Sequence, residues 1–301
     1  MSNALRSIPE HYVTAYATNW EHLSSQMISR LKGQVAFDTV EGKEKSYSKI
    51  GGVQFQRITE RAGATRIQDI TTSKRWLRPY PFDAAHYEDE WDEKFLGDVS
   101  KPDSDVLVEH SAAYGRLADQ IILEAAVGTA YTGEIGMTPI TLPASQTIAV
   151  DFVRTGSAAN SGLTLDKLRR AKRILDDNEV PDDEQRTIAV TSAQIEDLLR
   201  YTEVTSKDYN IVQALVDGTL NKFLGFEFKR VSSDIVPKSG NIRSVVFWSR
   251  RGIKLSDSGK QSHMDILPTQ SHCLQIRSVG LLGATRDEEK KVGVIYCDES
   301  V

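Results

Sequence analysis

The feature that most constrains the fold of this 301-residue chain is a long stretch, residues 35–82, with β-strand character and little apolar content. Thr, Val, Ile, Ser and Gly are frequent in it, and it alternates in places, as in RIQDI at 66–70. We expect two long extended segments joined by a turn near TERAGATR, at 59–66. Because a long polar hairpin is not stable alone in water, it needs a partner surface, in this chain or in another.

The residues before this stretch, 1–34, have the pattern of an amphipathic helix. Apolar side chains recur there at spacings of three and four, and Gly33 is a plausible end of the helix. They are Val13, Tyr16, Trp20, Leu23, Met27 and Leu31. Such an arm must bury its apolar stripe against its own domain or a neighbour.

Two helices are expected after the hairpin. In the acidic segment 83–98, aromatic residues at 87, 91 and 95 would lie on one helical face and pack against a neighbouring element. The clearest helix covers about 104–127, beginning after Pro102 and ending at Gly128. A helix of this size is roughly 35 Å long, so it should run the length of its domain.

The second half of the chain begins after a loop-like region with a boundary near Gly162. Over 163–231 helices and strands alternate: a helix capped by Thr164, the strand RTIAVT, a helix capped by Ser192, a helix from Asp208, and the strand FEFKRV. The C-terminal part is rich in strands, expected in the segments IRSVVFW, MDILPT, CLQIRSVGLLGATR and KKVGVIYC.

Six acidic residues lie within the nine positions of 176–184, and such a cluster could hold a metal or form a solvated turn. A calcium loop needs alternating ligands, a Gly at its sixth position and a Glu at its twelfth. This segment has Pro181 in its middle and no Gly, and its adjacent acids point in different directions. We therefore predict a solvated turn and no metal site.

No other catalytic or cofactor pattern is complete. VEGKEKS and DSGKQS contain Gly-Lys but lack the rest of a phosphate-binding loop, and the S-x-x-K pairs lack their companion motifs. The six histidines show no metal-binding spacing, and Cys273 and Cys297 are expected to be reduced thiols. We predict no enzyme activity, no catalytic residue and no cofactor.

The charge and hydropathy of the chain limit its partners. A net charge of -5 argues against nucleic-acid binding through one broad basic face. No apolar run approaches the roughly 18 residues that span a bilayer, so no membrane partner is expected. The N-terminus lacks a signal-peptide pattern, which favours a cytosolic origin.

Basic and aromatic residues interleave in SKRWLRPY, residues 73–80, at the end of the hairpin. Such interleaving can bind single-stranded nucleic acid, but a complementary acidic surface on another subunit is favoured here. The candidate contact residues are in the arm, the hairpin and the acidic segment after it. They are Trp20, Arg57, Arg61, Arg66, Lys74, Arg75, Trp76, Arg78, Glu88, Asp89 and Glu90.

Three segments, in this order, resemble the major capsid protein of tailed bacteriophages with the Hong Kong 97-type fold. The first is LTLDKLRRAKRILDDNEVPDDEQRTIAVTSAQIEDLL, a helix, an acidic turn with Pro, a strand and a second helix. The second is VDGTLNKFLGFEFKRVS, in which Gly225-Phe226 ends a helix and opens a strand. The third is the C-terminal pair SRRGIKLSD and LQIRSVGLLGATRDEEKKVGVI. The resemblance covers roughly residues 1–298.

The resemblance implies an α+β fold with five parts. These are an N-terminal arm (1–34), an extended β-hairpin loop (35–82), a peripheral domain with a long spine helix (83–160), an axial α/β domain (161–245) and the return strands of the peripheral domain (246–301). The acidic stretch would be a surface turn of the axial domain.

The resemblance also implies a function. The chain would assemble with itself, as hexamers and pentamers, into the icosahedral head of a tailed double-stranded DNA phage, in the host cytoplasm. Portal, scaffolding and decoration proteins are further partners, and the DNA would be enclosed without sequence-specific binding. An encapsulin-type nanocompartment shell is the alternative. Because the arm begins close to Met1, we expect a separate scaffolding protein or none.

Overall fold

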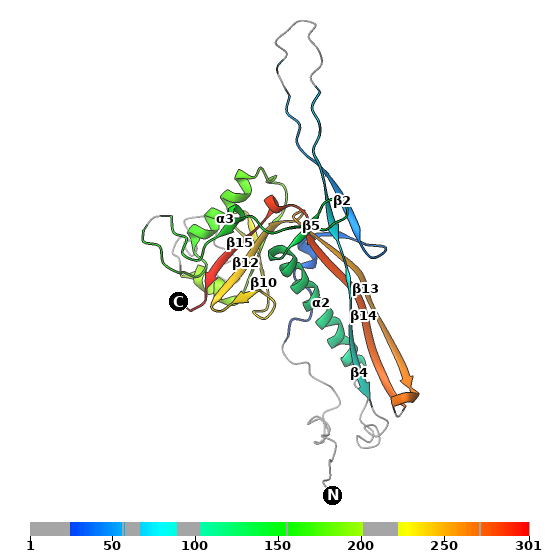
Figure 1. The fold of residues 1–301 in the computed structure, drawn as a ribbon. Helices are drawn as coiled ribbons and strands as arrows, with labels where there is room; N and C mark the ends of the chain where they lie inside the picture. The colour runs from blue at the N-terminus through cyan, green and yellow to red at the C-terminus, as the bar shows by residue number, and fades with distance from the viewer. Residues whose placement is uncertain are drawn as a thin grey trace.

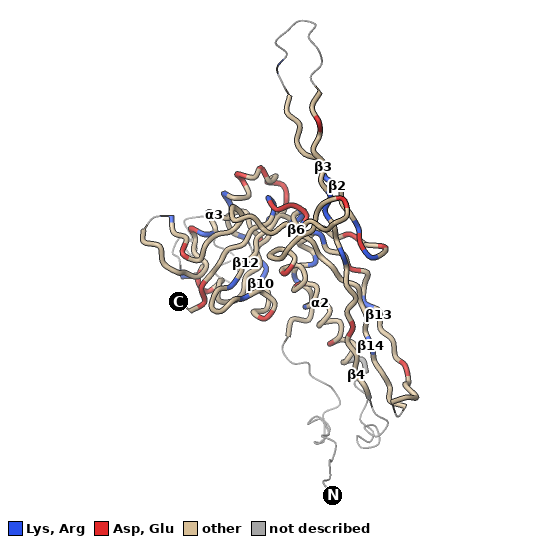
Figure 2. Tube along the Cα trace, in the orientation of Figure 1, with Lys and Arg blue, Asp and Glu red and all other residues tan. Residues whose placement is uncertain are grey.

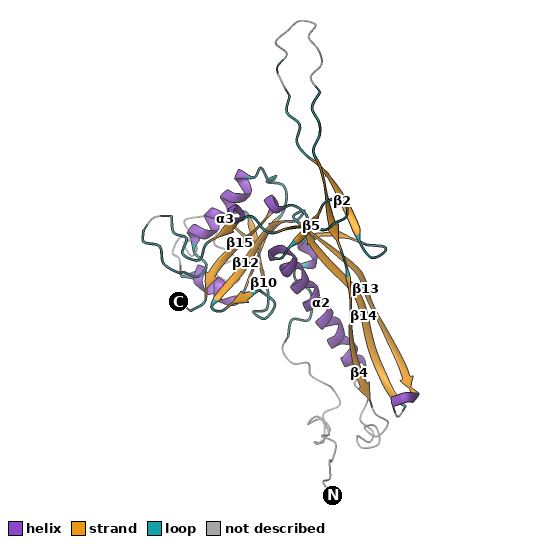
Figure 3. Cartoon of the chain, in the orientation of Figure 1, coloured by secondary structure: helices purple, strands orange, loops and turns teal. Residues whose placement is uncertain are grey.

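The computed structural model describes residues 25–55, 57, 67–88, 103–154, 156–200, 222–270 and 272–300. Figure 1 shows a rounded lobe on one side, a long helix lying beside a narrow sheet on the other, and a hairpin that projects from their junction. Figure 3 shows that helices and strands share the lobe, whereas the projecting part consists of extended chain. The chain is therefore α+β, as the resemblance implied.

The lobe is built on a seven-stranded mixed sheet in the order β7-β15-β12-β8-β10-β9, with β11 paired to β12. β10 pairs with β8, and β15 with β7, in parallel; the other pairs are antiparallel. The strands are β7 (Thr147–Ile148), β8 (Arg186–Val190), β9 (Lys222–Phe223), β10 (Phe226–Arg230), β11 (Lys238–Ser239), β12 (Ile242–Ser249) and β15 (Val292–Asp298).

Both faces of this sheet are covered. On one face α3 (Leu165–Asp177) and α4 (Ser192–Leu199) enclose a core in which the rings of Phe226 and Phe247 meet edge to face, with centroids 6.0 Å apart. On the other face the end of α2 (Asp103–Val127) packs against Trp248. Alternate residues of β12 belong to the two cores, so every residue from 245 to 249 is buried.

The narrow sheet has the order β1-β13-β14-β4 and lies along α2. Its strands are β1 (Ala36–Asp38), β13 (Ile253–Leu267), β14 (Cys273–Arg286) and β4 (Tyr80–Glu88). Tyr114 of α2 lies directly over Gly280 of β14, where an added Cβ would be 2.2 Å from the ring. The Tyr114 hydroxyl also donates to Asp257, 2.6 Å away, at an irregularity in β13. Gly280 therefore sets how closely the helix approaches the sheet.

A third sheet, β2-β3-β5-β6, forms the base of the hairpin. Its strands are β2 (Lys45–Ile50), β3 (Thr72–Leu77), β5 (Ala130–Thr132) and β6 (Thr138–Ile140). Single 3-10 turns complete the described elements: η2 (Lys32–Gln34), η3 (Ala144–Gln146), η5 (Pro268–Gln270) and η6 (Glu289–Lys291).

The chain enters the described structure along α2, where Asp119 holds it. This fully buried carboxylate accepts hydrogen bonds from Gln26 (2.5 Å) and Ser29 (2.6 Å), and from the backbone N–H groups of Arg30 (2.9 Å) and Leu31 (3.1 Å). Four donors on one carboxylate offset the cost of burying its charge. Residues 26–31 are thereby fixed to the long helix.

Several predicted elements are confirmed. The long helix expected at 104–127 is α2, Asp103–Val127. Thr164 is the N-cap of α3, since its side chain accepts the hydrogen bond of the Lys167 backbone N–H. The predicted strands of the lobe and of the C-terminal part are β8, β10, β12, β13, β14 and β15.

Three predictions are wrong in their described parts. Residues 25–31 are irregular rather than helical: the Gln26 and Ser29 side chains and the backbone N–H groups of Arg30 and Leu31 bond to Asp119. Residues 83–88 belong to β4, not to a helix, because β14 pairs with them throughout. Thr191, not Ser192, caps α4 through a capping box with Gln194. The helix expected from Asp208 and the rest of the arm lie outside the described residues.

Candidate subunit-contact surface

The projecting hairpin carries a set of exposed apolar side chains. β2 and β3 pair from Lys45 opposite Leu77 to Ile50 opposite Thr72, and Gly51 extends the pairing with a 2.7 Å bond to the Thr71 carbonyl. We call the described residues beyond this point, 51–55, 57 and 67–71, the projecting segment (Figure 1). Exposed large apolar residues of the segment and its border are Ile50, Val53, Phe55, Ile67 and Ile70.

The exposure of these side chains is large enough to matter energetically. Phe55 is fully exposed and Ile67 is 89% exposed. Burying one such side chain contributes about 1.5–3 kcal/mol, so the segment gains stability only when another surface covers it. Several large apolar side chains exposed on one short projecting segment are what a surface that meets another molecule would present.

The base of the hairpin is, by contrast, held by ion pairs within the chain. Arg75 is buried, lies 2.6 Å from Glu289 and donates to the Asp287 carbonyl at 3.1 Å. Lys49 lies 3.2 Å from the Asp287 carboxylate. Burial lowers the pKa of Lys49, and the neighbouring Asp287 opposes this shift. Figure 2 shows this concentration of charge where β2 and β3 meet the body.

A second group at the base surrounds Asp38. Its carboxylate accepts from Lys45 (2.9 Å) and from the Tyr47 hydroxyl (2.7 Å), and these hydrogen bonds lower its pKa. Burial and the bond to Asp38 raise the pKa of Tyr47 above its ordinary range. Lys254 of β13 lies 3.6 Å from the centre of the Tyr47 ring, a cation–π contact. Strand β2 is thereby tied to the narrow sheet.

Trp76 and Arg78 complete the base on the opposite strand. The Trp76 indole N–H donates to the Gly133 carbonyl (2.8 Å), and Arg78 bonds to Glu44 (2.8 Å) and to the Gly136 carbonyl (3.1 Å). Gly136 has φ +71°, and an added Cβ would lie 2.7 Å from Trp76. The turn between β5 and β6 therefore depends on glycine at this position.

The predicted contact residues fall into three groups: some bond within the chain, some are exposed, and some lie outside the described residues. Arg75, Trp76 and Arg78 use their polar groups inside the chain, at the hairpin base, which is a role the sequence did not predict. Lys74 and Arg57 are exposed, and Glu88 ends β4 opposite Leu274. The other candidates lie outside the described residues: Trp20, Arg61, Arg66, Asp89 and Glu90.

The acidic turn at 176–184 is only partly solvated. Asp176 (2.6 Å) and Asp182 (2.9 Å) both pair with Arg186, which is buried at the start of β8. Glu184 is also largely buried, and it pairs with Lys291 at 3.2 Å. Burial opposes ionisation of Glu184, but hydrogen bonds from Ser249 and Lys291 outweigh it and lower its pKa. The turn therefore ties α3 to β8.

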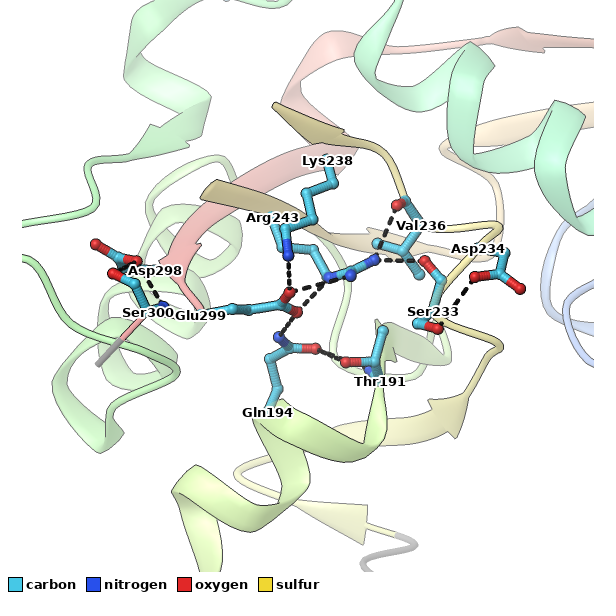
Figure 4. Close-up of polar contacts among 10 residues, drawn as sticks. All are labelled: Thr191, Gln194, Ser233, Asp234, Val236, Lys238, Arg243, Asp298, Glu299 and Ser300. Carbon is cyan, nitrogen blue, oxygen red and sulfur yellow. Dashed lines mark hydrogen bonds and ion pairs between the residues drawn. The ribbon is translucent and has the colours of Figure 1, made fainter. Parts of the chain in front are cut away.

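A further polar cluster closes the C-terminal end of the lobe around Glu299 (Figure 4). Glu299 accepts from Arg243, from Lys238 at 2.7 Å and from Gln194 at 2.9 Å. Burial opposes its ionisation, but these hydrogen bonds outweigh that effect and lower its pKa to about 2. Arg243 also donates to the Ser233 and Val236 carbonyls, so the cluster joins β11, β12 and α4 to residue 299.

Among the described residues, no group of three or more His, Cys, Asp or Glu side chains has the arrangement of a metal site. Within the same residues, no helix combines the length and apolarity that crossing a membrane requires. Of the two thiols, Cys273 is half-buried and Cys297 is buried; burial raises the pKa of Cys297 to about 12. The exposed hairpin is thus the feature that most needs a functional explanation.

Comparison with known proteins supplies a family. Residues 8–299 match a family model described as phage capsid protein. No curated protein sequence matches the chain.

Several solved structures share the fold at low sequence identity. The capsid structure of cyanophage P-SCSP1u has a TM-score of 0.70 and 14% identity, over 95% of this chain and 92% of that one. The mature capsid of bacteriophage PhiM1 has a TM-score of 0.68 and 9% identity, over 95% and 91%. The head structure of Helicobacter pylori bacteriophage KHP40 has a TM-score of 0.68 and 9% identity, over 99% of each chain. These likenesses show the fold.

Proposed function

Because this chain belongs to the phage capsid protein family and is a structural capsid protein, we propose that it forms hexamers and pentamers and closes into the head of a tailed double-stranded DNA phage. The family places it in the virion capsid, where it assembles with copies of itself. The proposal adds how the copies meet. The projecting segment of one subunit lies over a neighbouring subunit, which covers Val53, Phe55, Ile67 and Ile70.

The exposed apolar side chains of the hairpin are the observation that carries this proposal. A segment with Phe55 fully exposed is a poor structure for an isolated protein. Its base, however, is fixed by Arg75, Lys49 and Trp76. In a ring, one surface of each subunit meets a different surface of the next. A hairpin whose base is held in place and whose end is exposed can make such a contact, because the base directs the exposed end toward the neighbour.

We propose that different parts of the chain make different contacts in the shell. The arm (1–34), the extended loop (35–82), the peripheral parts (83–160 and 246–301) and the axial domain (161–245) would each make different contacts. We propose portal, scaffolding and decoration proteins as further partners, and assembly in the host cytoplasm. The net charge of -5 suits a container that encloses DNA without gripping its bases.

An encapsulin shell, the alternative that the sequence left open, is not favoured. The family match is to phage capsid proteins.

Electron microscopy of the purified full chain, expressed alone and together with its neighbouring phage genes, tests the proposal. We expect rings of five and six subunits or closed shells, and nuclease-protected DNA only when the packaging genes are present. A chain that stays monomeric in both preparations contradicts it. Shells that hold a protein cargo and no DNA favour the encapsulin alternative instead.

A further inference from the structure

The most unusual buried charge in the lobe is the ammonium group of Lys167, in the first turn of α3. The residue is fully buried. Its Nζ donates to four backbone carbonyls, those of Ser161 (2.7 Å), Val150 (2.8 Å), Gly162 (2.9 Å) and Tyr296 (3.0 Å). An ammonium group has three hydrogens, so four oxygens surround it completely and share them.

The four oxygens come from three segments of the chain that meet beside the first turn of α3. Val150 follows β7, Ser161 and Gly162 precede α3, and Tyr296 belongs to β15. The Ser161 N–H bonds to the Val150 carbonyl at 3.2 Å, and the Asp298 N–H bonds to the Ser161 carbonyl at 3.0 Å. The connection between β7 and α3 is therefore closed into a loop whose two ends meet at Lys167.

The charge of Lys167 is balanced by dipoles rather than by a counter-ion. Among the described residues, no carboxylate lies within ion-pair distance of its Nζ. Asp151, Asp197 and Asp298 act on it only from a distance, and burial lowers its pKa. Convergent backbone carbonyls that replace the water around a cation are the chemistry by which proteins bind alkali ions. An uncompensated buried ammonium would be very unfavourable, so the cage and the charge depend on each other.

We propose that the carbonyls of Val150, Ser161, Gly162 and Tyr296 form a monovalent-cation site that Lys167 fills from within the chain, and that this internal cation positions the described parts of the connection, 149–154 and 156–162, on the lobe. Lys167 is a positioning residue in this view. Within the connection, Phe152 packs against the core. Leu163, which follows the connection, donates its N–H to Asp197 at 3.1 Å. The inference does not rest on the proposed function, since it concerns one subunit.

The decisive experiment asks whether a free cation can replace the side chain. The full-length subunit is prepared as Lys167→Ala and, as a matched control on the same helix, Lys172→Ala; thermal unfolding is followed in NaCl, KCl and NH₄Cl at equal ionic strength. We expect K167A to lower the Tm by at least about 5 °C, because four buried carbonyls lose the hydrogen bond from the ammonium group, and only those of Val150 and Ser161 keep the backbone donors named above. K⁺ and NH₄⁺, which match the size of the ammonium group, should restore part of this loss, and the smaller Na⁺ should restore less. The Tm of the wild type and of K172A should not depend on which of the three cations is present.

A local measurement separates positioning from general stability. Arg154 is an exposed trypsin site inside the connection. We expect Lys167→Met, which keeps the length but not the charge, to speed cleavage after Arg154 at least tenfold while other sites are little affected. Equal responses of K167A to Na⁺ and K⁺, or wild-type cleavage in K167M, overturn the proposal.

If neither variant folds, the unmodified protein decides. Brief labelling with an amine-reactive reagent, read by mass spectrometry, should modify the half-buried Lys172 and leave Lys167 unmodified. Equal labelling of the two lysines would show that the cage does not hold Lys167 and would overturn the proposal.

Discussion

The lobe and the projecting hairpin differ in how far each buries its apolar side chains and pairs its charges within one chain. In the lobe, Trp248 and Phe247 are fully buried and the charges of Lys167 and Glu299 are matched by groups of the same chain. In the hairpin, charge is satisfied at the base but Phe55 remains uncovered. One subunit therefore buries its own core, whereas its longest extension keeps large apolar side chains exposed that only a second surface could cover.

The largest expected effect on the free energy of unfolding is in the lobe core. Phe247→Ala removes a fully buried ring that packs against Phe226 and should cost about 3–5 kcal/mol in denaturant unfolding of the unassembled subunit. Phe55→Ala, the same change on the projecting segment, should cost less than about 0.5 kcal/mol. Similar losses for the two variants would contradict the difference in burial between the lobe core and the projecting segment.

The next effect is the response of the lobe to acid. The pKa of Glu299 is lowered from 4.5 to about 2 in the folded chain, so its contribution is fully present above pH 4.5 and is lost as the pH falls toward 2. The shift corresponds to about 3 kcal/mol. We expect unfolding measured between pH 5 and 3 to show about half of this loss in the wild type and a weaker pH dependence in Glu299→Gln. Parallel pH profiles for the two proteins would show that the cluster does not stabilise the lobe.

A smaller effect is expected at the hairpin base. Arg75→Ala leaves Glu289 without its 2.6 Å partner and should destabilise the subunit by about 2 kcal/mol. It should also raise the hydrogen-exchange rate of the amides that pair β2 with β3. Arg57→Ala, which removes an exposed arginine from the projecting segment, is the matched control and should change neither quantity. Equal exchange rates in the two variants would mean that the base is not held by this ion pair.

The smallest effect on subunit stability, and the largest on assembly, is expected in the projecting segment. The double variant Val53→Ser with Phe55→Ser should unfold within about 0.5 kcal/mol of the wild type, because both side chains are already exposed. Shells or rings should nevertheless be lost or strongly reduced in electron micrographs. Gln54→Ser, an exposed polar change between the two sites, should assemble normally. Normal assembly of the double variant would refute the proposed covering of the hairpin by a neighbour.

Patterns that repeat along the sequence were sufficient to predict the regular parts of the fold. The apolar stripe between Pro102 and Gly128 gave α2 within one residue, and Thr164 was correctly identified as the cap of α3. These features are local, since a helix and its cap are determined by neighbours a few residues away. The resemblance in the C-terminal half added the order of the remaining elements.

The errors share a cause. Tyr87 has helical spacing to Trp91 and Phe95, but residues 80–88 pair with β14, almost 200 positions later. Residues 26–31 follow a helical pattern, yet Asp119 binds the backbone N–H groups of Arg30 and Leu31. In both places a contact that is distant in the sequence decided the local structure, and no window of neighbouring residues contains that information.

A long helix, a polar hairpin with too little apolar content to be stable alone, and a lobe of alternating helices and strands could all be predicted from the residues, because they follow from local periodicity and composition. The partners of the buried charges could not be predicted in this way and depend on the fold. The fold placed Arg75 inside the hairpin base, Asp119 under the arm and Lys167 within four carbonyls. The physical reason is that a buried charge is stabilised by whichever dipoles and ions the fold brings to it, and those come from distant parts of the chain.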